Sequence, residues 1–528
     1  MPRKFRSFSL SVLSVILAGT SVLALAQDKK PGEPKAQSPA ATAATEASKT
    51  APTTEQSSVT QHTLALNGKT IHYTATAGNL IIRDKDDKPN GSMFYVAYTE
   101  DGAEAKGRPV TFLYNGGPGS STLWLHMGSF GPMRIETSSP EATPPAPYNL
   151  VPNQSSLLDI TDLVFIDAMG TGFSRPIDKG TLKDFLGVDE DVRTFNRFIT
   201  RYLTVNQRWN SPKFLIGESY GTTRSAALAY SLQQSGISLN GVTLISSILN
   251  YNDTAPGTDG EYIGFLPSFA AIAWYHDKLA NKPADLQAFL DQARAYARGP
   301  YAEALWQGQN LSAAEEDQVA QKLSQMTGLS VQYWKDANLR VSASDFRKEL
   351  MRGDRRTLGR YDARFEGIDV DAIGEIPTYD ASDTGITGAF VAAFHNYLTA
   401  DLKFSSDETY KATAYGPDFK WDEKHTPPGG GGGMRGQQQL PDVALDLGAA
   451  MRENPHLKLF SANGYFDLAT PFFKTEFDIS HMQLDPTLRK NIQFHYYPSG
   501  HMIYLNVDAL KQLKADLVQF YSSAATQQ

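Results

Sequence analysis

The pentapeptide Gly217-Glu218-Ser219-Tyr220-Gly221 constrains the fold of this 528-residue chain more than any other stretch. It follows an apolar run, KFLIG, and precedes a helix-like run, TTRSAALAYSLQQ. A serine between two glycines at a strand-to-helix junction is typical of a nucleophile elbow, whose tight turn holds the hydroxyl clear of its own backbone. The alternative is a chance loop, because glycine and serine are common. The flanking strand and helix favour the elbow, and they predict an α/β fold.

The N-terminal residues have the pattern of a secretory signal. A basic start (Arg3, Lys4 and Arg6) precedes the apolar run SLSVLSVILAGTSVLAL and an A-x-A site at residues 24–26. The alternative is a membrane anchor, but the run is short and is broken by Gly and Ser. We therefore expect residues 1–26 to be a cleaved signal peptide. No other segment is long and apolar enough to cross a bilayer, so we expect no stable membrane span after its removal.

The composition indicates which classes of partner and which cellular compartment fit this chain. The net charge is −8 and no basic patch stands out, which argues against a nucleic-acid partner. The chain has no cysteine, so an exported form cannot be stabilised by disulfides. Export without disulfides fits a bacterial periplasmic or secreted protein.

The pattern of residues divides the chain into segments. After the signal, a stretch rich in Ala, Thr, Pro and Ser predicts a disordered linker. Strand-rich segments then flank a long helical segment that ends in five consecutive glycines. That glycine run lacks the Gly-Lys-Ser/Thr ending of a phosphate-binding loop, so we interpret it as a flexible connector. The expected boundaries are a linker at 27–57, the first part of the core at 58–254, a mainly helical insertion or lid at 255–440, and the second part of the core at 441–528.

Periodicity predicts the elements of this core. Alternating residues predict N-terminal antiparallel strands within 62–68, 69–77, 79–84 and 92–100, with turns at Asn67-Gly68 and Asn90-Gly91. Beyond them, strands alternate with helices, which implies a mostly parallel sheet. The strands are expected at 109–115, 161–168, 213–217, 241–247, 457–464 and 491–498. The helices are expected at 188–205, 222–234, 271–280, 284–297, 312–326 (opening with a Ser312–Glu315 capping box) and 508–523.

Two residues are candidate partners for Ser219. A serine hydroxyl needs a base, and the base needs a third group to orient it. In chains with this elbow the partners follow in the order Ser, Asp or Glu, His, each after a strand. Asp467 follows LKLFSANG and His501 follows NIQFHYYP, so both fit. The alternatives are a helix N-cap for Asp467 and a structural loop histidine for His501.

The same chemistry needs N–H donors for the oxyanion of the tetrahedral intermediate. One donor is expected from the residue after the nucleophile, Tyr220, and the other from a loop after an early strand. The sequence Asn115-Gly116-Gly117-Pro118-Gly119 follows PVTFLY and fits that role, because glycines allow backbone groups to approach a substrate. The alternative is an ordinary glycine turn.

Five ordered motifs together resemble the serine carboxypeptidases, over roughly Ser58 to the C-terminus. The motifs are NGGPGSS, IDAMGTGFS, GESYG, GYFD and GHM. The resemblance implies an α/β-hydrolase fold with an insertion over the active site, a Ser219–Asp467–His501 triad, and an oxyanion hole formed by Gly117 and Tyr220. It also implies that the substrate's terminal carboxylate is bound by Asn115, Gly116 and Glu218.

Two features depart from this family. Ser129 stands where the family often has a second glutamate, which puts carboxylate recognition in doubt, and the absent cysteines differ from disulfide-bonded eukaryotic members. The expected function is a serine-type carboxypeptidase acting through an acyl-enzyme on peptides with a free C-terminal carboxylate. Because that carboxylate must share a proton with Glu218, cleavage is expected to be favoured in acid. The alternatives are an esterase or acyltransferase, or a non-catalytic binding protein. No cofactor is expected, and no metal-binding motif is present.

Overall fold

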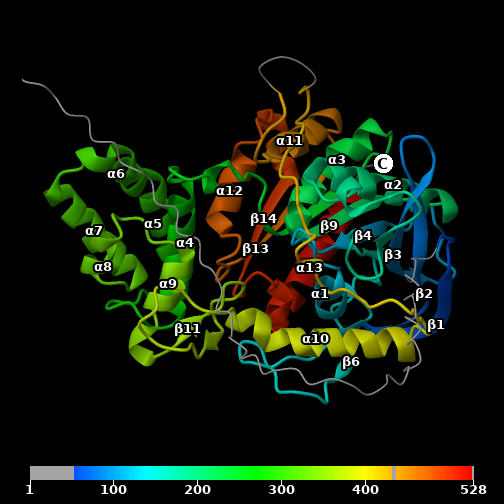
Figure 1. The fold of residues 1–528 in the computed structure, drawn as a ribbon, viewed down its shortest axis with the longest axis horizontal. Helices are drawn as coiled ribbons and strands as arrows, with labels where there is room; N and C mark the ends of the chain where they lie inside the picture. The colour runs from blue at the N-terminus through cyan, green and yellow to red at the C-terminus, as the bar shows by residue number, and fades with distance from the viewer. Residues whose placement is uncertain (1–52, 431–435, 526–528) are drawn as a thin grey trace, which may run out of the picture. The chain divides into compact units, whose positions relative to one another are not determined.

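The computed structural model describes residues 53–430 and 436–525 (Figure 1). The predicted signal peptide, most of the predicted linker and the last three glycines of the glycine run lie outside the described residues. The first strand begins at Ser57, and Glu55 forms an ion pair with Arg201. The described end of the predicted linker is therefore bound to the folded part of the chain.

Ten strands of the described residues form one sheet at the centre of the fold (Figure 1). The first pairings are antiparallel, and every pairing from β7 onward is parallel. The sheet is therefore mostly parallel with antiparallel N-terminal strands, as the sequence predicts. Its order is β1 (Ser57–Leu66), β2 (Lys69–Arg83), β3 (Pro89–Glu100), β7 (Asp162–Ile166), β4 (Val110–Tyr114), β9 (Lys213–Ser219), β10 (Gly241–Ser247), β13 (Lys458–Gly464) and β14 (Ile492–Tyr497), while β8 (Arg175–Pro176) pairs with β3.

The turns between the first strands confirm one prediction and correct another. Asn67-Gly68 joins β1 to β2 with φ values of 52° and 74°, which suit a tight hairpin turn. The predicted turn at Asn90-Gly91 is wrong, because both residues lie inside β3. The predicted break near Gly78 is also wrong, because β2 continues through it. Gly78 instead allows the chain at Gln56 to approach β2 closely, since a Cβ on Gly78 would lie 2.4 Å from the carbonyl oxygen of Gln56.

The helices and short hairpins complete the described structure. Two short hairpins outside the main sheet pair β5 (Met133–Ile135) with β6 (Leu150–Pro152), and β11 (Thr357–Leu358) with β12 (Glu366–Gly367), within the described ranges. The helices are α1 (Leu123–Leu125), α2 (Val188–Val205), α3 (Tyr220–Gln234), α4 (Gly260–Tyr275), α5 (Leu286–Tyr296), α6 (Ala302–Gln307), α7 (Ala313–Thr327), α8 (Val331–Asp336), α9 (Ala343–Glu349), α10 (Ala381–Ala400), α11 (Ala444–Glu453), α12 (Phe472–Ser480) and α13 (Val507–Ala525).

Helices cover both faces of the sheet, so successive residues of its central strands are buried on opposite sides. In β4, Phe112 and Tyr114 belong to the apolar cluster that includes residues of α2, α3 and α11. Leu113 belongs to the cluster that includes residues of α10 and α13. Burial on both faces explains why the central strands read as continuous apolar runs in the sequence.

The segment between β10 and β13 holds most of the remaining helices. Helices α4 to α9 share an apolar cluster, which includes Phe269, Trp334 and Phe346 and extends to Phe472 at the start of α12. Helix α10 instead buries Phe390 and Phe394 in the cluster beneath the sheet. Within the range expected to be one insertion, the helices therefore pack against two different clusters.

Several helix bounds can be compared with the sequence predictions. Helix α2 and strand β10 have the predicted bounds, and the predicted capping box is present, with Ser312 and Glu315 hydrogen-bonded reciprocally at the start of α7. Helix α4 spans Gly260–Tyr275 rather than 271–280, so the second half of that predicted helix is wrong.

Candidate active site

Ser219 lies at the junction of β9 and α3, in the sharp turn that the sequence predicts. Its φ is 60° and its ψ is −131°, a backbone conformation that L-residues rarely adopt. Close packing maintains this turn. A Cβ on Gly217 would lie 2.1 Å from the carbonyl oxygen of Gly221, and a Cβ on Gly116 would lie 2.4 Å from the backbone nitrogens of Tyr220 and Gly221. The glycines are therefore required by the approach of strand, helix and loop.

His501 and Asp467 are hydrogen-bonded in the interior of the protein. Nδ1 of His501 lies 2.8 Å from Oδ2 of Asp467, and both side chains are buried. Asp467 also accepts hydrogen bonds from the backbone nitrogens of Ala469 (2.7 Å) and Thr470 (3.0 Å). The next helix, α12, begins only at Phe472, with Pro471 as its N-cap. Asp467 therefore orients the imidazole and is not a helix N-cap.

Thr470 adds a third partner to this pair. Its hydroxyl donates a hydrogen bond of 2.7 Å to Oδ2 of Asp467 and lies 3.1 Å from Nδ1 of His501. The backbone of His501 is also fixed, because its N–H donates to the carbonyl of Tyr361 at 2.6 Å and its carbonyl accepts from Ser246 at 2.6 Å. His501 is thus held in place by hydrogen bonds to both its ring and its main chain.

The charges around His501 determine how readily it is protonated. Burial opposes protonation, but the Asp467 carboxylate and its hydrogen bond outweigh that effect and raise the pKa of His501. Glu218 acts in the same direction and Arg360 in the opposite one. An imidazole with a raised pKa next to a carboxylate is suited to accept a proton and return it.

A cavity of about 490 Å³ brings the predicted side chains together. Ser219 and His501 both line it, and so do Glu218 and the loop that follows β4. Tyr220 does not line it; its side chain is buried, and its hydroxyl donates to Asp191 at 3.3 Å. For Tyr220, only the backbone therefore remains available for the predicted role.

The loop after β4 has the backbone form that glycine allows. Gly117 has a φ of 107° and Gly119 a φ of 88°. A Cβ on Gly117 would lie 2.8 Å from the backbone nitrogens of Gly119 and Ser120. The N–H of Ser120 donates to the carbonyl of Gly116 at 3.0 Å. The loop is therefore tightly turned beside Ser219, with glycine backbone exposed to the cavity.

Asn115 and Glu218 form a buried pair at the base of the cavity. Nδ2 of Asn115 donates a hydrogen bond of 2.8 Å to Oε1 of Glu218, and Oδ1 of Asn115 accepts from the N–H of Leu125 at 2.9 Å. Burial raises the pKa of Glu218 to about 7, although the charge of His501 lowers it. Within the described residues, Oε2 of Glu218 has no hydrogen-bond partner of normal geometry, and Tyr504 approaches the same carboxyl. One oxygen of this carboxyl is therefore buried beside the Tyr504 hydroxyl, while the other is held by Asn115.

Ser129 takes no part in this cavity. It lies in a turn of π-helix at His126–Phe130, is fully buried, and donates a hydrogen bond of 2.6 Å to the carbonyl of Leu125. Ser129 therefore cannot take over the role that a glutamate at this position would have in the cavity.

Three residues of the site, Arg360, Tyr361 and Thr470, were not predicted from the sequence. Arg360 and Tyr361 come from the segment between β10 and β13 and line the same cavity as Ser219. The ring of Tyr361 lies 5.2 Å from that of His501, and the Arg360 guanidinium lies over the Tyr361 ring. No motif marks these two residues. Thr470 could have been found, because it follows Asp467 by three residues in the predicted turn.

Between residues 53 and 525, apart from 431–435, no group of three His, Cys, Asp or Glu side chains is arranged to hold a metal ion. Over the same residues, no helix is long and apolar enough to cross a membrane.

Known proteins similar to this chain include yeast carboxypeptidases. The pheromone-processing carboxypeptidase KEX1 of Saccharomyces cerevisiae is 30% identical over 156 residues, which are 27% of this chain and 20% of that protein. KEX1 of Yarrowia lipolytica is 28% identical over 166 residues, which are 31% of this chain and 25% of that protein. The matched segments thus span a quarter or less of both relatives.

The crystal structure of KEX1(delta)p, a prohormone-processing carboxypeptidase from S. cerevisiae, resembles this fold. It has a TM-score of 0.52 and 15% identity, and the match covers 85% of this chain and 91% of that one. Together with the sheet order described above, this likeness identifies an α/β-hydrolase fold. The family model for serine carboxypeptidases matches residues 68–339, just over half of the chain. The chain therefore belongs to the serine carboxypeptidase family.

Proposed function

We propose that this protein is a serine carboxypeptidase that removes C-terminal residues from peptides. The observation that carries the proposal is the single cavity lined by Ser219, His501 and Glu218. A nucleophile and its base line that cavity together with a carboxyl group whose pKa is raised by burial. Membership of the family supports the same activity.

The proposed reaction has two steps. The Ser219 hydroxyl attacks the carbonyl carbon of the last peptide bond while Nε2 of His501 takes its proton. His501 gives that proton to the departing amine, and an acyl-enzyme remains on Ser219. Water then attacks the acyl carbon and loses a proton to His501. The bond to Ser219 breaks, His501 returns the proton to the Ser219 oxygen, and the shortened peptide leaves. Asp467 holds the imidazole in the required tautomer through Nδ1.

Backbone donors stabilise the oxyanion in this proposal. The N–H groups of Gly117 and Tyr220 are assigned to the oxygen that becomes negative in each tetrahedral intermediate. The close contact between Gly116 and the backbone nitrogen of Tyr220 supports this assignment, since it brings the two backbone segments together.

The terminal carboxylate of the substrate is assigned to Asn115, Gly116 and Glu218. A carboxylate beside Glu218 is repelled unless one of the two groups is protonated, and the raised pKa of Glu218 supports a protonated carboxyl there. Arg360 lines the same cavity. We assign its cation to the same end of the substrate, in place of the second glutamate, because arginine binds carboxylates with charge-assisted hydrogen bonds.

The N-terminal pattern further supports export to the periplasm or the medium. Mass spectrometry of the mature protein would test this proposal, with an N-terminus at Gln27 expected.

The test of the activity compares matched substrates. A free-carboxyl peptide should be cleaved with a kcat/KM at least about a hundredfold above that of its C-terminal amide, because the amide cannot form the charge-assisted bonds. A fluorophosphonate probe should label the wild type at Ser219 and leave Ser219→Ala unlabelled. Equal cleavage of peptide and amide, or faster turnover of an ester without a carboxylate, would favour the esterase or acyltransferase alternative.

A further inference from the structure

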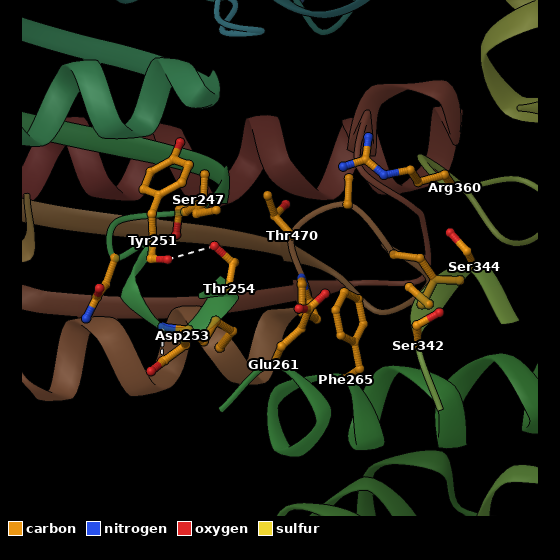
Figure 2. Close-up of a pocket in the computed structure, with 17 residues that line it drawn as sticks. Ser247, Tyr251, Asp253, Thr254, Glu261, Phe265, Ser342, Ser344, Arg360 and Thr470 are labelled. Atoms are coloured by element: carbon orange, nitrogen blue, oxygen red, sulfur yellow. Dashed lines mark hydrogen bonds and ion pairs between the residues drawn. The ribbon is translucent and has the colours of Figure 1, made fainter. Parts of the chain in front are cut away.

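A second cavity, of about 310 Å³, adjoins the candidate active site (Figure 2). Arg360 lines both cavities, so it forms part of a shared wall. Thr470, which bonds to Asp467, also lines the second cavity. Figure 2 shows Arg360 and Thr470 above the space and Glu261 and Phe265 below it in this view. The second cavity is therefore within reach of a substrate that occupies the first.

The strand order indicates which part of a substrate reaches this second cavity. The loop with Asn115 follows β4, which lies on one side of β9 and Ser219. The second cavity is lined by Ser247 at the end of β10, by several residues of the following loop as far as Thr254, and by residues 468–471 after β13. Both strands lie on the other side of β9. If the carboxylate end of a peptide lies over the β4 loop, its acyl part extends toward β10. This step rests on the function proposed above.

Glu261 gives this cavity a carboxylate that has no hydrogen-bond or ion-pair partner of its own. It lies in the first turn of α4, is half-buried, and burial raises the pKa of its carboxyl. No hydrogen bond or ion pair involves its side chain within the described part of the chain. Asp253, which lines the same cavity, is paired with Lys474 at 2.9 Å. The Arg360 guanidinium lies over the ring of Tyr361, and no ion pair links it to Glu261. The negative charge of Glu261 is therefore left for a ligand.

The wall next to Glu261 is apolar. Phe265, one helical turn further along α4, lines the same cavity and is 6% exposed. An aromatic wall that ends in a carboxylate fits a cationic group carried on methylenes, because such groups bury their stems and keep their charge paired.

We propose that the second cavity binds an ammonium or guanidinium group on the acyl side of the peptide substrate, with Glu261 as its ion-pair partner. That group has two possible sources: a Lys or Arg side chain upstream of the scissile bond, or the α-amino group of a short peptide. Both present the same chemistry to Glu261, and the arms of the experiment separate them.

The experiment uses short peptides with one constant C-terminal residue. One arm compares N-acetylated peptides that carry lysine or norleucine at the second or third residue from the C-terminus. The other arm compares a norleucine peptide with a free or an acetylated N-terminus. In at least one arm, the kcat/KM of the wild type should be about tenfold higher for the cationic peptide than for its neutral counterpart. In Glu261→Gln this ratio of cationic to neutral kcat/KM should be close to one. The control, Glu303→Gln, changes an exposed glutamate of α6 and should keep the ratio.

Two results would overturn the subsite. The first is a ratio near one in every arm for the wild type, and the second is an equal loss of the ratio in Glu261→Gln and Glu303→Gln. Failure of the carboxypeptidase function gives a different result, because no peptide, neutral or cationic, would then be shortened. In that case, calorimetric binding of the same peptides to Ser219→Ala still compares lysine with norleucine. Equal affinities there would also overturn the proposal.

Discussion

Nδ2 of Asn115 donates a hydrogen bond of 2.8 Å to Oε1 of Glu218, and both side chains are buried next to Ser219. Because burial raises the pKa of Glu218 to about 7, this carboxyl keeps its proton well above the pH at which an exposed glutamate loses it. A protonated Glu218 can donate to a substrate carboxylate, whereas an ionised one repels it. The pair therefore links substrate binding to pH.

The first prediction concerns the alkaline side of the pH profile. The kcat/KM of the wild type for a free-carboxyl peptide should fall as the pH rises through about 7, because Glu218 loses its proton there. In Glu218→Gln the neutral amide cannot ionise, so this fall should disappear. The comparison is a pair of pH–rate profiles, with an ester substrate that lacks a carboxylate as control. An identical alkaline fall in both proteins would rule out Glu218 as the group responsible.

The second prediction tests Thr470 as a positioning residue. Thr470→Val removes the hydroxyl that donates to Asp467 at 2.7 Å. We expect kcat to fall about tenfold with little change in KM for a neutral peptide, because a hydrogen bond to a charged group is lost near the base. Thr470→Ser keeps the hydroxyl and should restore most of kcat. If the valine and serine variants have the same activity, the hydroxyl has no positioning role.

The third prediction concerns the turn that carries the nucleophile. In Gly217→Ala the new Cβ would lie 2.1 Å from the carbonyl oxygen of Gly221, so strand and helix must move apart. We expect a loss of about 3 kcal/mol in the free energy of unfolding, together with loss of fluorophosphonate labelling. The matched control is Gly107→Ala, where no atom lies within 4 Å of the added Cβ. Similar denaturation curves for both variants would contradict this account of the elbow.

The sequence predicted the parts of the site that depend on local structure. Ser219 ends a strand, Asp467 and His501 each follow one, and the carboxyl ends of parallel strands meet at one edge of the sheet. Their convergence therefore follows from the strand pattern. The tightly turned glycine loop after β4 could be predicted for the same reason.

Residues brought in by tertiary packing could not be predicted. The backbone N–H of His501 donates a hydrogen bond to the carbonyl of Tyr361. The two residues lie in different segments that are far apart in the sequence. The hydroxyl of Ser129 donates a hydrogen bond to the carbonyl of Leu125 in the same helical turn, so the side chain is directed away from the cavity. Helix α10 was missed because its central residues, 389–394, are all apolar, so the sequence shows no helical alternation there.

The fourth prediction concerns stability in alkali. His425 lies between two carboxylates, with Nδ1 2.7 Å from Asp189 and Nε2 2.9 Å from Asp446. Although burial opposes its charge, the two carboxylates raise the pKa of His425 to about 9, above its ordinary value of 6.5. The ion pairs therefore contribute fully to stability below about pH 6.5, and this contribution is lost as the pH rises through about 9.

Thermal unfolding between pH 6 and 10 tests this expectation. His425→Gln should be less stable than the wild type by about 3 kcal/mol at the acid end, because the buried carboxylate of Asp446 and the partly exposed one of Asp189 lose their cation. The difference should shrink toward the alkaline end, where the wild-type histidine is neutral. A difference that stays constant over the whole range would show that His425 contributes by packing and not by charge.

The most direct test of the central claim is mass spectrometry of a mixed peptide pool after incubation with the enzyme. The account predicts ladders shortened only from the C-terminus by the wild type, and intact peptides with Ser219→Ala at the same concentration. Shortening from the N-terminus, internal cleavage, or equal ladders from both proteins would contradict it.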